Sequence, residues 1–486
     1  MQVTRRSLLR TLAAGSAALA AGTVPMRPEP AYSRPLGPVI APVSGETVRL
    51  DLIAAERQLS LPCFAGRRLP LWTFTDAALP PVVRLRLGDR LVARVENRLP
   101  RAGEHISIHW HGIRLPNDQD GVAWLTQDPI EPGEAFDYAF TPPDTGTFFF
   151  HTHCNTVEQL GRGLAGILIV EGDETEPYDA EEVLVLRDWR VGDAGFLPFM
   201  TDEGASRAGS FGPIRSANGA PAASFRLPAS ADVRIRVLNV DASRLLSLGV
   251  EGAEAAVVAI DGIAVPPFPL KAWTMGPAMR ADIVLRTPPE GGTARLVDYR
   301  PAKPFLLAAI STAGPPRRTG AFDPAPLRAA RIAEPDLGRA ERLPLTLSTT
   351  ATADAVSAAL EGPAGGIDDL CLSDRTFWAL NKAAWPADGH RRLPPPLMVL
   401  RKGGSYVIEI ANTTRQIHPM HLHGLTFKVL RSNKRDLPVH HADTVLLLPK
   451  ERLEVAFVAD NPGDWMIHCH LIEHQETGMM GYLRVA

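Results

Sequence analysis

Short runs in which hydrophobic and polar residues alternate dominate the chain. Residues 82–87 (VVRLRL) and 233–237 (VRIRV) are two examples, and clusters rich in proline and glycine separate such runs. Successive side chains of a β-strand point to opposite faces of a sheet, so this period of two predicts half-buried strands. No long stretch has the period of a helix. The pattern therefore predicts an all-β protein made of β-sandwich domains.

One alternating element recurs three times along the chain. Residues 88–97, 231–239 and 403–412 each contain a turn that leads into an alternating strand and closes on asparagine. A segment rich in proline, arginine and alanine without strand alternation, residues 312–345, is typical of a surface linker. The three copies predict three consecutive β-sandwich domains.

A stronger repeat links the two ends of the chain. HWHG at 109–112 recurs as HLHG at 421–424. Residues 140–151 likewise recur as 457–468, with the same spacing from the first Phe to the last His and from the Gly to that His. The first and last domains are therefore predicted to be copies of one unit that each contribute histidines, while the middle copy contains none. The predicted divisions are a signal segment at 1–24, domains at 45–175, 176–315 and 345–486, and a linker at 316–344.

Composition narrows the function classes. The 486 residues carry a formal net charge of -3 with both signs interspersed, which excludes the basic surface of a nucleic-acid binder. The four cysteines form no CxxC pair, so zinc-ribbon and thioredoxin-type sites are unsupported. One disulfide among Cys63, Cys154 and Cys371 is possible outside the cytoplasm, although Cys154 is favoured as a buried structural thiol.

The first 24 residues predict export. Arg5 and Arg6 precede a mild apolar stretch and Ala-Leu-Ala at 18–20. That stretch is well below the roughly 20 residues of a membrane span. It resembles a cleavable twin-arginine signal, which delivers folded proteins to the twin-arginine export machinery. We therefore expect a soluble periplasmic protein, monomeric and without stable membrane insertion.

Histidine is the residue that carries the chemistry. Ten of the fourteen histidines fall into four short clusters, and each cluster contains a His-x-His pair. Chance predicts about 0.4 such pairs in a chain of this composition. Residues i and i+2 of a strand share a face, so each pair can grip one metal site. His105, His390, His440 and His441 lack this spacing and are interpreted as surface or packing residues.

Strand parity divides the clusters into two sites. Cys469 lies between His468 and His470, so its side chain points away from that pair, and the three-residue offset of His418 from His421 has the same effect. A thiolate with two imidazoles, Cys469 with His418 and His474, is the ligand set of a blue-copper electron-transfer centre, and Met479 can supply the axial thioether. The backbone on either side of Cys469 would carry electrons to an all-histidine cluster.

These four signatures, in this order and spacing, resemble those of the multicopper oxidases, and the resemblance runs from about residue 45 to the C-terminus. It implies three consecutive cupredoxin-like Greek-key β-sandwich domains and four copper ions. A small-molecule donor would be oxidised by one electron at type 1 copper, and dioxygen would be reduced to water at a trinuclear cluster. The resemblance implies these copper ligands: His418, Cys469, His474 and axial Met479 for type 1; His109 and His421 for type 2; and His111, His151, His153, His423, His468 and His470 for the type 3 pair.

Proton delivery to reduced oxygen is less sharply indicated. Asp120 matches a family carboxylate near the type 2 copper, although a turn aspartate before glycine fits the sequence equally well. Many bacterial members carry an acid directly after the last type 1 histidine, where this chain has Gln475. Glu473 and Glu476 are both candidates to replace that acid.

Several functions fit the copper signatures. The first is laccase-like oxidation of phenols or aromatic amines, and the second is oxidation of Cu(I) or other metal ions for copper tolerance. Cuprous oxidases of the family carry a Met-rich segment in the last domain, whereas Met398 is the only methionine between residues 340 and 419, which favours the organic donors. A non-catalytic cell-division relative would have lost its ligands, and a copper store would favour clusters of thiols and thioethers.

Overall fold

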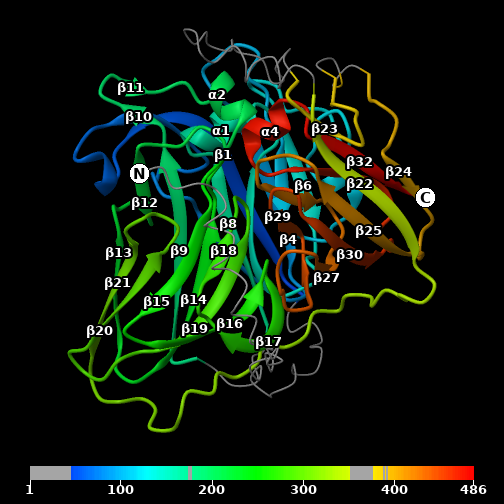
Figure 1. Cartoon of the computed structure of the whole chain (residues 1–486). Coiled ribbons are helices and arrows are strands. Elements are labelled where there is room, and N and C mark those ends of the chain that lie inside the picture. The colour runs from blue at the N-terminus through cyan, green and yellow to red at the C-terminus, as the bar shows by residue number, and fades with distance from the viewer. Residues whose placement is uncertain (1–44, 173–177, 351–375, 387–388, 390–391) are drawn as a thin grey trace, which may run out of the picture.

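The computed structural model describes residues 45–172, 178–350, 376–386, 389 and 392–486. The predicted signal at 1–24, together with Cys371 and His390, lies outside these residues. The described strands form three pairs of sheets in consecutive stretches of the chain (Figure 1). The all-β prediction is thereby confirmed.

The first pair joins sheets of four strands each, in the orders β2-β1-β4-β6 and β3-β8-β7-β5. Its strands are β1 (Thr47–Leu59), β2 (Leu69–Thr73), β3 (Val82–Arg86), β4 (Arg90–Arg98), β5 (Ile108–His111), β6 (Ala135–Phe140), β7 (Gly146–Thr152) and β8 (Ala165–Glu171).

The second pair joins a six-stranded sheet, β12-β9-β14-β19-β16-β17, to a five-stranded sheet, β13-β21-β20-β15-β18. Its strands are β9 (Ala180–Trp189), β12 (Ile214–Ala217), β13 (Ala223–Pro228), β14 (Asp232–Asn239), β15 (Leu246–Glu251), β16 (Glu254–Ile260), β17 (Ile263–Pro269), β18 (Trp273–Met275), β19 (Arg280–Arg286), β20 (Thr293–Asp298) and β21 (Phe305–Ala313).

The third pair joins the six-stranded sheet β23-β22-β25-β30-β27-β28 to the five-stranded sheet β24-β32-β31-β26-β29. Its strands are β22 (Glu341–Thr349), β23 (Trp378–Leu380), β24 (Met398–Leu400), β25 (Ser405–Asn412), β26 (His418–Leu422), β27 (Phe427–Ser432), β28 (His440–Ala442), β29 (Thr444–Leu447), β30 (Arg452–Val458), β31 (Gly463–Cys469) and β32 (Met480–Val485).

Short elements connect and cover the sheets. A small hairpin follows β9, and the short helices lie close together at one end of the sheets (Figure 1), where one of them follows β7 and another follows β31. These elements are β10 (Val191–Gly192), β11 (Gly195–Phe196), α1 (Thr156–Arg162), α2 (Asp202–Ser206), α4 (Ile472–Glu476) and the 3-10 turns η1 (Pro62–Phe64) and η2 (Asn117–Gln119). Among the described residues, no helix has the length and apolar character needed to cross a bilayer.

The threefold repeat corresponds to three equivalent strands, β4, β14 and β25. Each pairs in parallel with the first long strand of its own sheet and antiparallel with a later strand. The closing asparagines, Asn97, Asn239 and Asn412, are buried, and the Oδ1 of each accepts the backbone N–H two residues later, at 3.1, 3.4 and 2.9 Å. The amide side chain thus replaces the ladder where the strand ends.

The segment between β21 and β22 contains none of the named strands or helices. Phe322 and Leu327 nevertheless pack into a buried apolar cluster against the second sheet pair. The domain limits predicted from the sequence, and the linker at 316–344, stay predictions.

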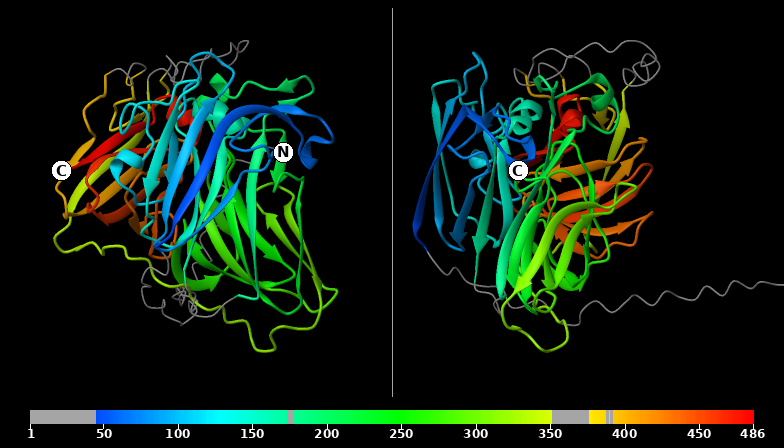
Figure 2. Two further views of the ribbon diagram at one scale, coloured as in Figure 1. Left: turned by 180° about the vertical axis from the view of Figure 1, so that it is seen from behind. Right: turned by 90° about the vertical axis from the view of Figure 1, so that its left-hand side faces the viewer.

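The first and third sheet pairs share one hydrophobic core. Buried residues from β1–β8 and from β22–β32 form a single apolar cluster, while the second pair has its own. The right-hand view of Figure 2 shows the first pair in blue and the third in orange on opposite sides, with the green second pair between and below them. This packing brings strands more than 300 residues apart in sequence to one site.

Candidate metal centre

Cys469 and two histidines form one compact group, here called the thiol site. The Nδ1 atoms of His418 and His474 each lie 3.6 Å from Cys469 Sγ and 3.1 Å from each other. All three side chains are buried, and they come from β26, β31 and α4. Met479 is also buried, and its carbonyl accepts the Cys469 N–H at 3.0 Å.

The outer ring nitrogens of the thiol site are held in place. His418 Nε2 lies 2.8 Å from Thr414 Oγ1, and His474 Nε2 donates to the carbonyl of Arg207 at 2.6 Å. Burial lowers the pKa of His474 to about 3 and raises that of the Cys469 thiol. The imidazoles are therefore neutral, and their Nδ1 lone pairs face the sulfur, as metal ligation requires.

The other eight clustered histidines gather where the first and third sheet pairs meet, and are here called the histidine cluster. Strand register explains the pairing: His109 stands opposite His151 in β5 and β7, and His421 stands opposite His468 in β26 and β31. Ligand atoms within 4.8 Å of one another form three trios: His109, His421 and His423; His111, His151 and His470; and His153, His423 and His468.

Several ring nitrogens in the histidine cluster have no hydrogen-bond partner although they are buried. They are His111 Nδ1, His151 Nε2, His153 Nε2 and both nitrogens of His470. Burying a polar atom without a partner costs free energy, so such a set is a strong sign of a missing ligand. Burial also lowers the pKa of His153 to about 3, which keeps its ring neutral. Neutral imidazoles at this density fit copper.

Two aspartates connect the halves of the histidine cluster in the same way. The Asp120 carbonyl lies 3.0 Å from His109 Nδ1, and Asp120 Oδ2 lies 2.9 Å from His423 Nδ1 in the other half. Asp443 mirrors it, because its carbonyl lies 2.9 Å from His421 Nδ1 and its Oδ1 lies 3.1 Å from His111 Nε2. Each acid therefore fixes one ring of its own sheet pair and one ring of the other.

Sequence reasoning found Asp120 but missed Asp443. Asp120 follows His109 by 11 residues, whereas Asp443 follows His421 by 22, so no repeated spacing connects them. It also missed Arg280 of β19, whose buried guanidinium donates to Asp443 at 2.9 and 2.6 Å. This arginine lowers the pKa of the Asp443 carboxyl. The histidine-free second sheet pair thus supports the metal site.

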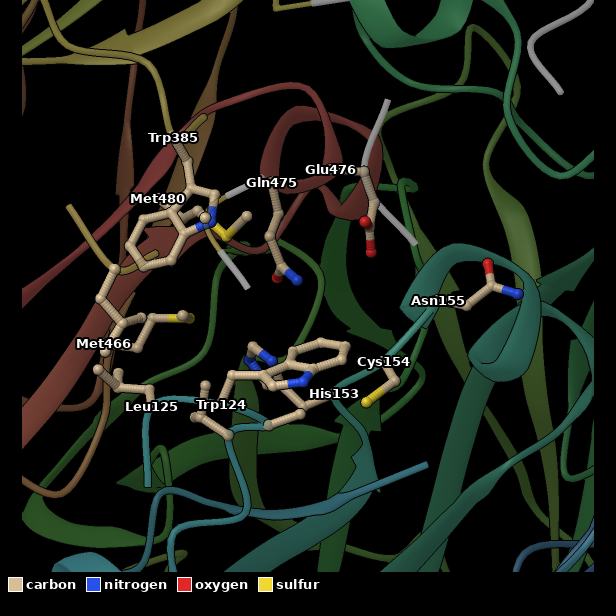
Figure 3. A pocket seen from close by; sticks show the side chains of 14 residues that line it. Trp124, Leu125, His153, Cys154, Asn155, Trp385, Met466, Gln475, Glu476 and Met480 are labelled. Atoms are coloured by element: carbon tan, nitrogen blue, oxygen red, sulfur yellow. The ribbon is translucent and has the colours of Figure 1, made fainter. Parts of the chain in front are cut away.

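The two glutamates proposed from the sequence face different surroundings. Glu476 lines a pocket of about 50 Å³ beside His153 and Gln475, and Figure 3 shows both α4 side chains directed into it. Glu473 instead binds the segment 201–210, where its Oε1 accepts from Ser210 Oγ at 2.6 Å. Burial raises the pKa of Glu476 to about 8 and that of Glu473 to about 7.

The other cysteines and histidines of the described residues belong to neither the thiol site nor the histidine cluster. Cys63 is a free thiol, and the buried Cys154 Sγ lies 3.6 Å from Ser107 Oγ. His440 is buried against Trp273, with ring centroids 6.1 Å apart. His105 packs edge-on against Trp124, and His441 lies 3.8 Å from Glu334.

Sequence and structure comparisons agree on the relatives of this arrangement. Two family profiles, both described as multicopper oxidase, match residues 60–175 and 373–486. Multicopper oxidase MmcO of Mycobacterium tuberculosis is 30% identical over 470 residues, which cover 90% of this chain and 87% of that protein. The chain belongs to the multicopper oxidase family. It is therefore a copper-binding oxidoreductase that uses dioxygen.

Further relatives differ in what their names describe. A copper resistance protein A homolog of Pseudomonas syringae pv. tomato is 24% identical and covers 100% of this multicopper oxidase and 99% of that protein. The crystal structure of a multi-copper oxidase from Pseudomonas thermotolerans matches with a TM-score of 0.80 and 37% identity, covering 91% of this chain and 100% of that one. The crystal structure of Lac15 from a marine microbial metagenome matches with a TM-score of 0.70 and 28% identity, covering 90% of this chain and 100% of that one.

Proposed function

We propose that this multicopper oxidase takes single electrons from phenols or aromatic amines at a type 1 copper and uses four of them to reduce dioxygen to two waters at a trinuclear cluster. Bound copper would supply the one-electron chemistry and the activation of oxygen. The observation that carries the proposal is the separation of a thiol site from a histidine cluster, with the two joined through adjacent residues of β31.

Within this proposal the ligands keep the assignments made from the sequence. His418, Cys469 and His474, together with Met479, would hold type 1 copper, and His109 and His421 would hold type 2 copper. Two of the three trios support the type 3 pair, because they use six histidines once each: His111, His151 and His470 around one ion, and His153, His423 and His468 around the other.

Proton supply is proposed for Asp120 and Glu476. Asp120 contacts rings of both halves of the histidine cluster, and Glu476 lines the pocket beside His153. Glu473 is the weaker candidate, since its carboxylate is taken up by Ser210 and Thr201. Four protons and four electrons balance the conversion of one dioxygen to two waters.

A second candidate function is oxidation of Cu(I) or another metal ion for copper tolerance. The names of the copper resistance protein A relatives favour it. The absence of a Met-rich segment between residues 340 and 419 favours organic donors. We further propose a periplasmic protein exported by the twin-arginine route, on the strength of Arg5, Arg6 and the apolar stretch after them.

Metal analysis and spectroscopy test the core of the proposal. The purified protein should contain about four copper ions per chain, as its ligand sets require. It should also show a blue absorption band that Cys469→Ser abolishes. Oxygen uptake measured with a methoxyphenol, Cu(I), Mn(II) and Fe(II) would then rank the donors. Zinc in place of copper, or a colourless protein after copper loading, would contradict the proposal.

A further inference from the structure

A cleft of about 530 Å³ opens beside the thiol site, between the second and third sheet pairs. One wall contains Ile417, which precedes the ligand His418, and Leu471, whose carbonyl accepts the His474 N–H at 2.8 Å. Ala208 and the exposed ring of Phe211 also line the cleft. The volume lies within the range of small-molecule sites, about 300–1,000 Å³.

The segment 201–211, which contributes Ala208 and Phe211 to the cleft, also covers His474. Trp378 packs on the His474 ring at 4.4 Å and donates its indole N–H to Ala205 at 2.7 Å, while Glu473 binds Ser210. The helices involved, α2 and α4, contact each other (Figure 1). The peptide unit between Arg207 and Ala208 accepts from His474 Nε2 at 2.6 Å. A donor in the cleft is therefore separated from the ligand ring by one hydrogen-bonded peptide unit.

The charged residues that line the cleft are mostly positive. Three arginines line it: Arg244, Arg300 and Arg415. Arg244 forms an ion pair with Asp188, but no carboxylate of the described residues lies within ion-pair distance of the exposed side chains of Arg300 and Arg415. The one acidic lining residue, Asp298, is buried and binds Arg215 at 2.9 Å. Two uncompensated guanidinium groups thus face the cleft.

Such a cleft selects donors by charge. A guanidinium binds a carboxylate with a planar pair of N–H donors, and a positive cleft raises the local concentration of anions. The same field repels protonated amines and the cations Cu(I), Fe(II) and Mn(II). Phe211, with the Arg244 guanidinium 4.9 Å from its ring centroid, offers an aromatic surface for the donor ring.

We infer that the preferred electron donor is a phenol that also carries a carboxylate, held by Arg300 and Arg415 in this cleft. The inference rests on the proposed function and names the substrate class for it. Each donor loses one electron and its phenolic proton to become a phenoxyl radical. Four donors thereby supply the four electrons and four protons that turn one dioxygen into two waters.

Three phenols of equal ring chemistry test the inference on the copper-loaded enzyme. They are 3-(4-hydroxy-3-methoxyphenyl)propanoate, its neutral propanamide and the cationic 4-(2-aminoethyl)-2-methoxyphenol, in which a two-carbon spacer insulates the ring from the charge. We expect kcat/KM for oxygen uptake to fall in that order, with the acid about tenfold above the amide at low ionic strength. Added salt should shrink this ratio because it screens the guanidinium groups.

The variant Arg300→Gln/Arg415→Gln should lower the acid-to-amide ratio to near one. The matched control is Arg339→Gln, which removes a side chain 90% exposed and outside the cleft, and should leave the ratio unchanged. The inference would be overturned by an acid-to-amide ratio near one in the unmodified enzyme, or by a ratio that the double variant does not lower. Oxygen uptake and the blue band would in that case still support the proposed function. A colourless enzyme inactive with all three phenols would contradict both.

Discussion

At the scale of single residues, Asp120 joins the two halves of the histidine cluster. Its carboxylate contacts His109 and His423 from different sheet pairs. Asp120→Asn keeps the shape but removes the charge and the capacity to exchange a proton. We expect oxygen turnover to fall about 10–100-fold, as for other residues that orient metal ligands. The blue band should persist, because the thiol site contains no Asp120 contact.

Stopped-flow measurements separate the two halves of that reaction. Anaerobic reduction of the type 1 copper by a phenol should proceed at the same rate in Asp120→Asn as in the unmodified enzyme, whereas reoxidation by dioxygen should be slow. Oxygen consumption that stays unchanged at every pH would remove the proposed role of Asp120.

His440 gives a pH dependence that is independent of the copper sites. Burial lowers its pKa from 6.5 to about 4, and its Nδ1–H donates to Pro438 at 2.6 Å. The folded protein therefore resists protonation that the unfolded chain accepts. The contribution of His440 to the free energy of unfolding is complete above pH 6.5. This contribution is lost as the pH falls toward 4, by up to about 3 kcal/mol.

Comparison with His440→Asn isolates this effect, because the asparagine amide can keep the bond to Pro438 but does not titrate. Melting temperatures of both proteins are measured with copper bound between pH 7.5 and pH 4.5. The melting temperature of the unmodified protein should fall more over this range than that of His440→Asn. Parallel curves over this range would show that His440 is not the group that titrates.

At the scale of elements, the closing asparagine of β25 positions a ligand of the thiol site. Asn412 Oδ1 lies 2.8 Å from Thr414 Oγ1, which in turn lies 2.8 Å from His418 Nε2. Asn412→Ala should lower stability by about 1–3 kcal/mol, because it leaves buried backbone groups without partners. It should also shift or broaden the blue band, since His418 loses its fixed orientation.

The threefold repeat provides the matched control for this prediction. Asn239 closes the equivalent strand β14 in the histidine-free second sheet pair, and its Nδ2 donates to the backbone carbonyl of Arg244 at 2.8 Å. Asn239→Ala should cost similar stability, read as a fall in melting temperature, but leave the absorption spectrum unchanged. A spectral change of equal size in both variants would mean that general loosening, and not the contact to His418, perturbs the site.

Local patterns made much of this organisation predictable. The repeated strands, the His-x-His pairs and the opposite orientation of Cys469 all follow from alternation along a strand. The choice between Glu473 and Glu476 does not follow from such a pattern. Residues three apart on a helix are neighbours on its surface, so the spacing alone does not tell which one faces the pocket. Only the packing of the segment 201–210 against Glu473 leaves Glu476 as the pocket residue. No periodicity encodes that contact across 263 residues.

At the scale of the whole molecule, Arg280 ties the three sheet pairs together. Its Nε donates to Thr147 O of the first pair at 3.1 Å, and its two terminal nitrogens bind Asp443 of the third pair. The remaining donors bind Ala278 O and Asp261 O at 3.1 and 2.9 Å. All five N–H groups of this buried guanidinium are thus used, a pattern that lysine cannot reproduce.

Removing this arginine should therefore affect stability and the metal site together. Arg280→Met leaves the Asp443 carboxylate buried without its cation, which should cost about 3–5 kcal/mol and lower the melting temperature. Copper retention in the histidine cluster should fall as well, because Asp443 then loses its fixed position beside His111. The double variant Arg280→Met/Asp443→Asn removes the unpaired charge and should regain part of the stability but not the copper. If the double variant were no more stable than Arg280→Met, the cost would lie in the lost contacts to Thr147 and Asp261 and not in the buried charge.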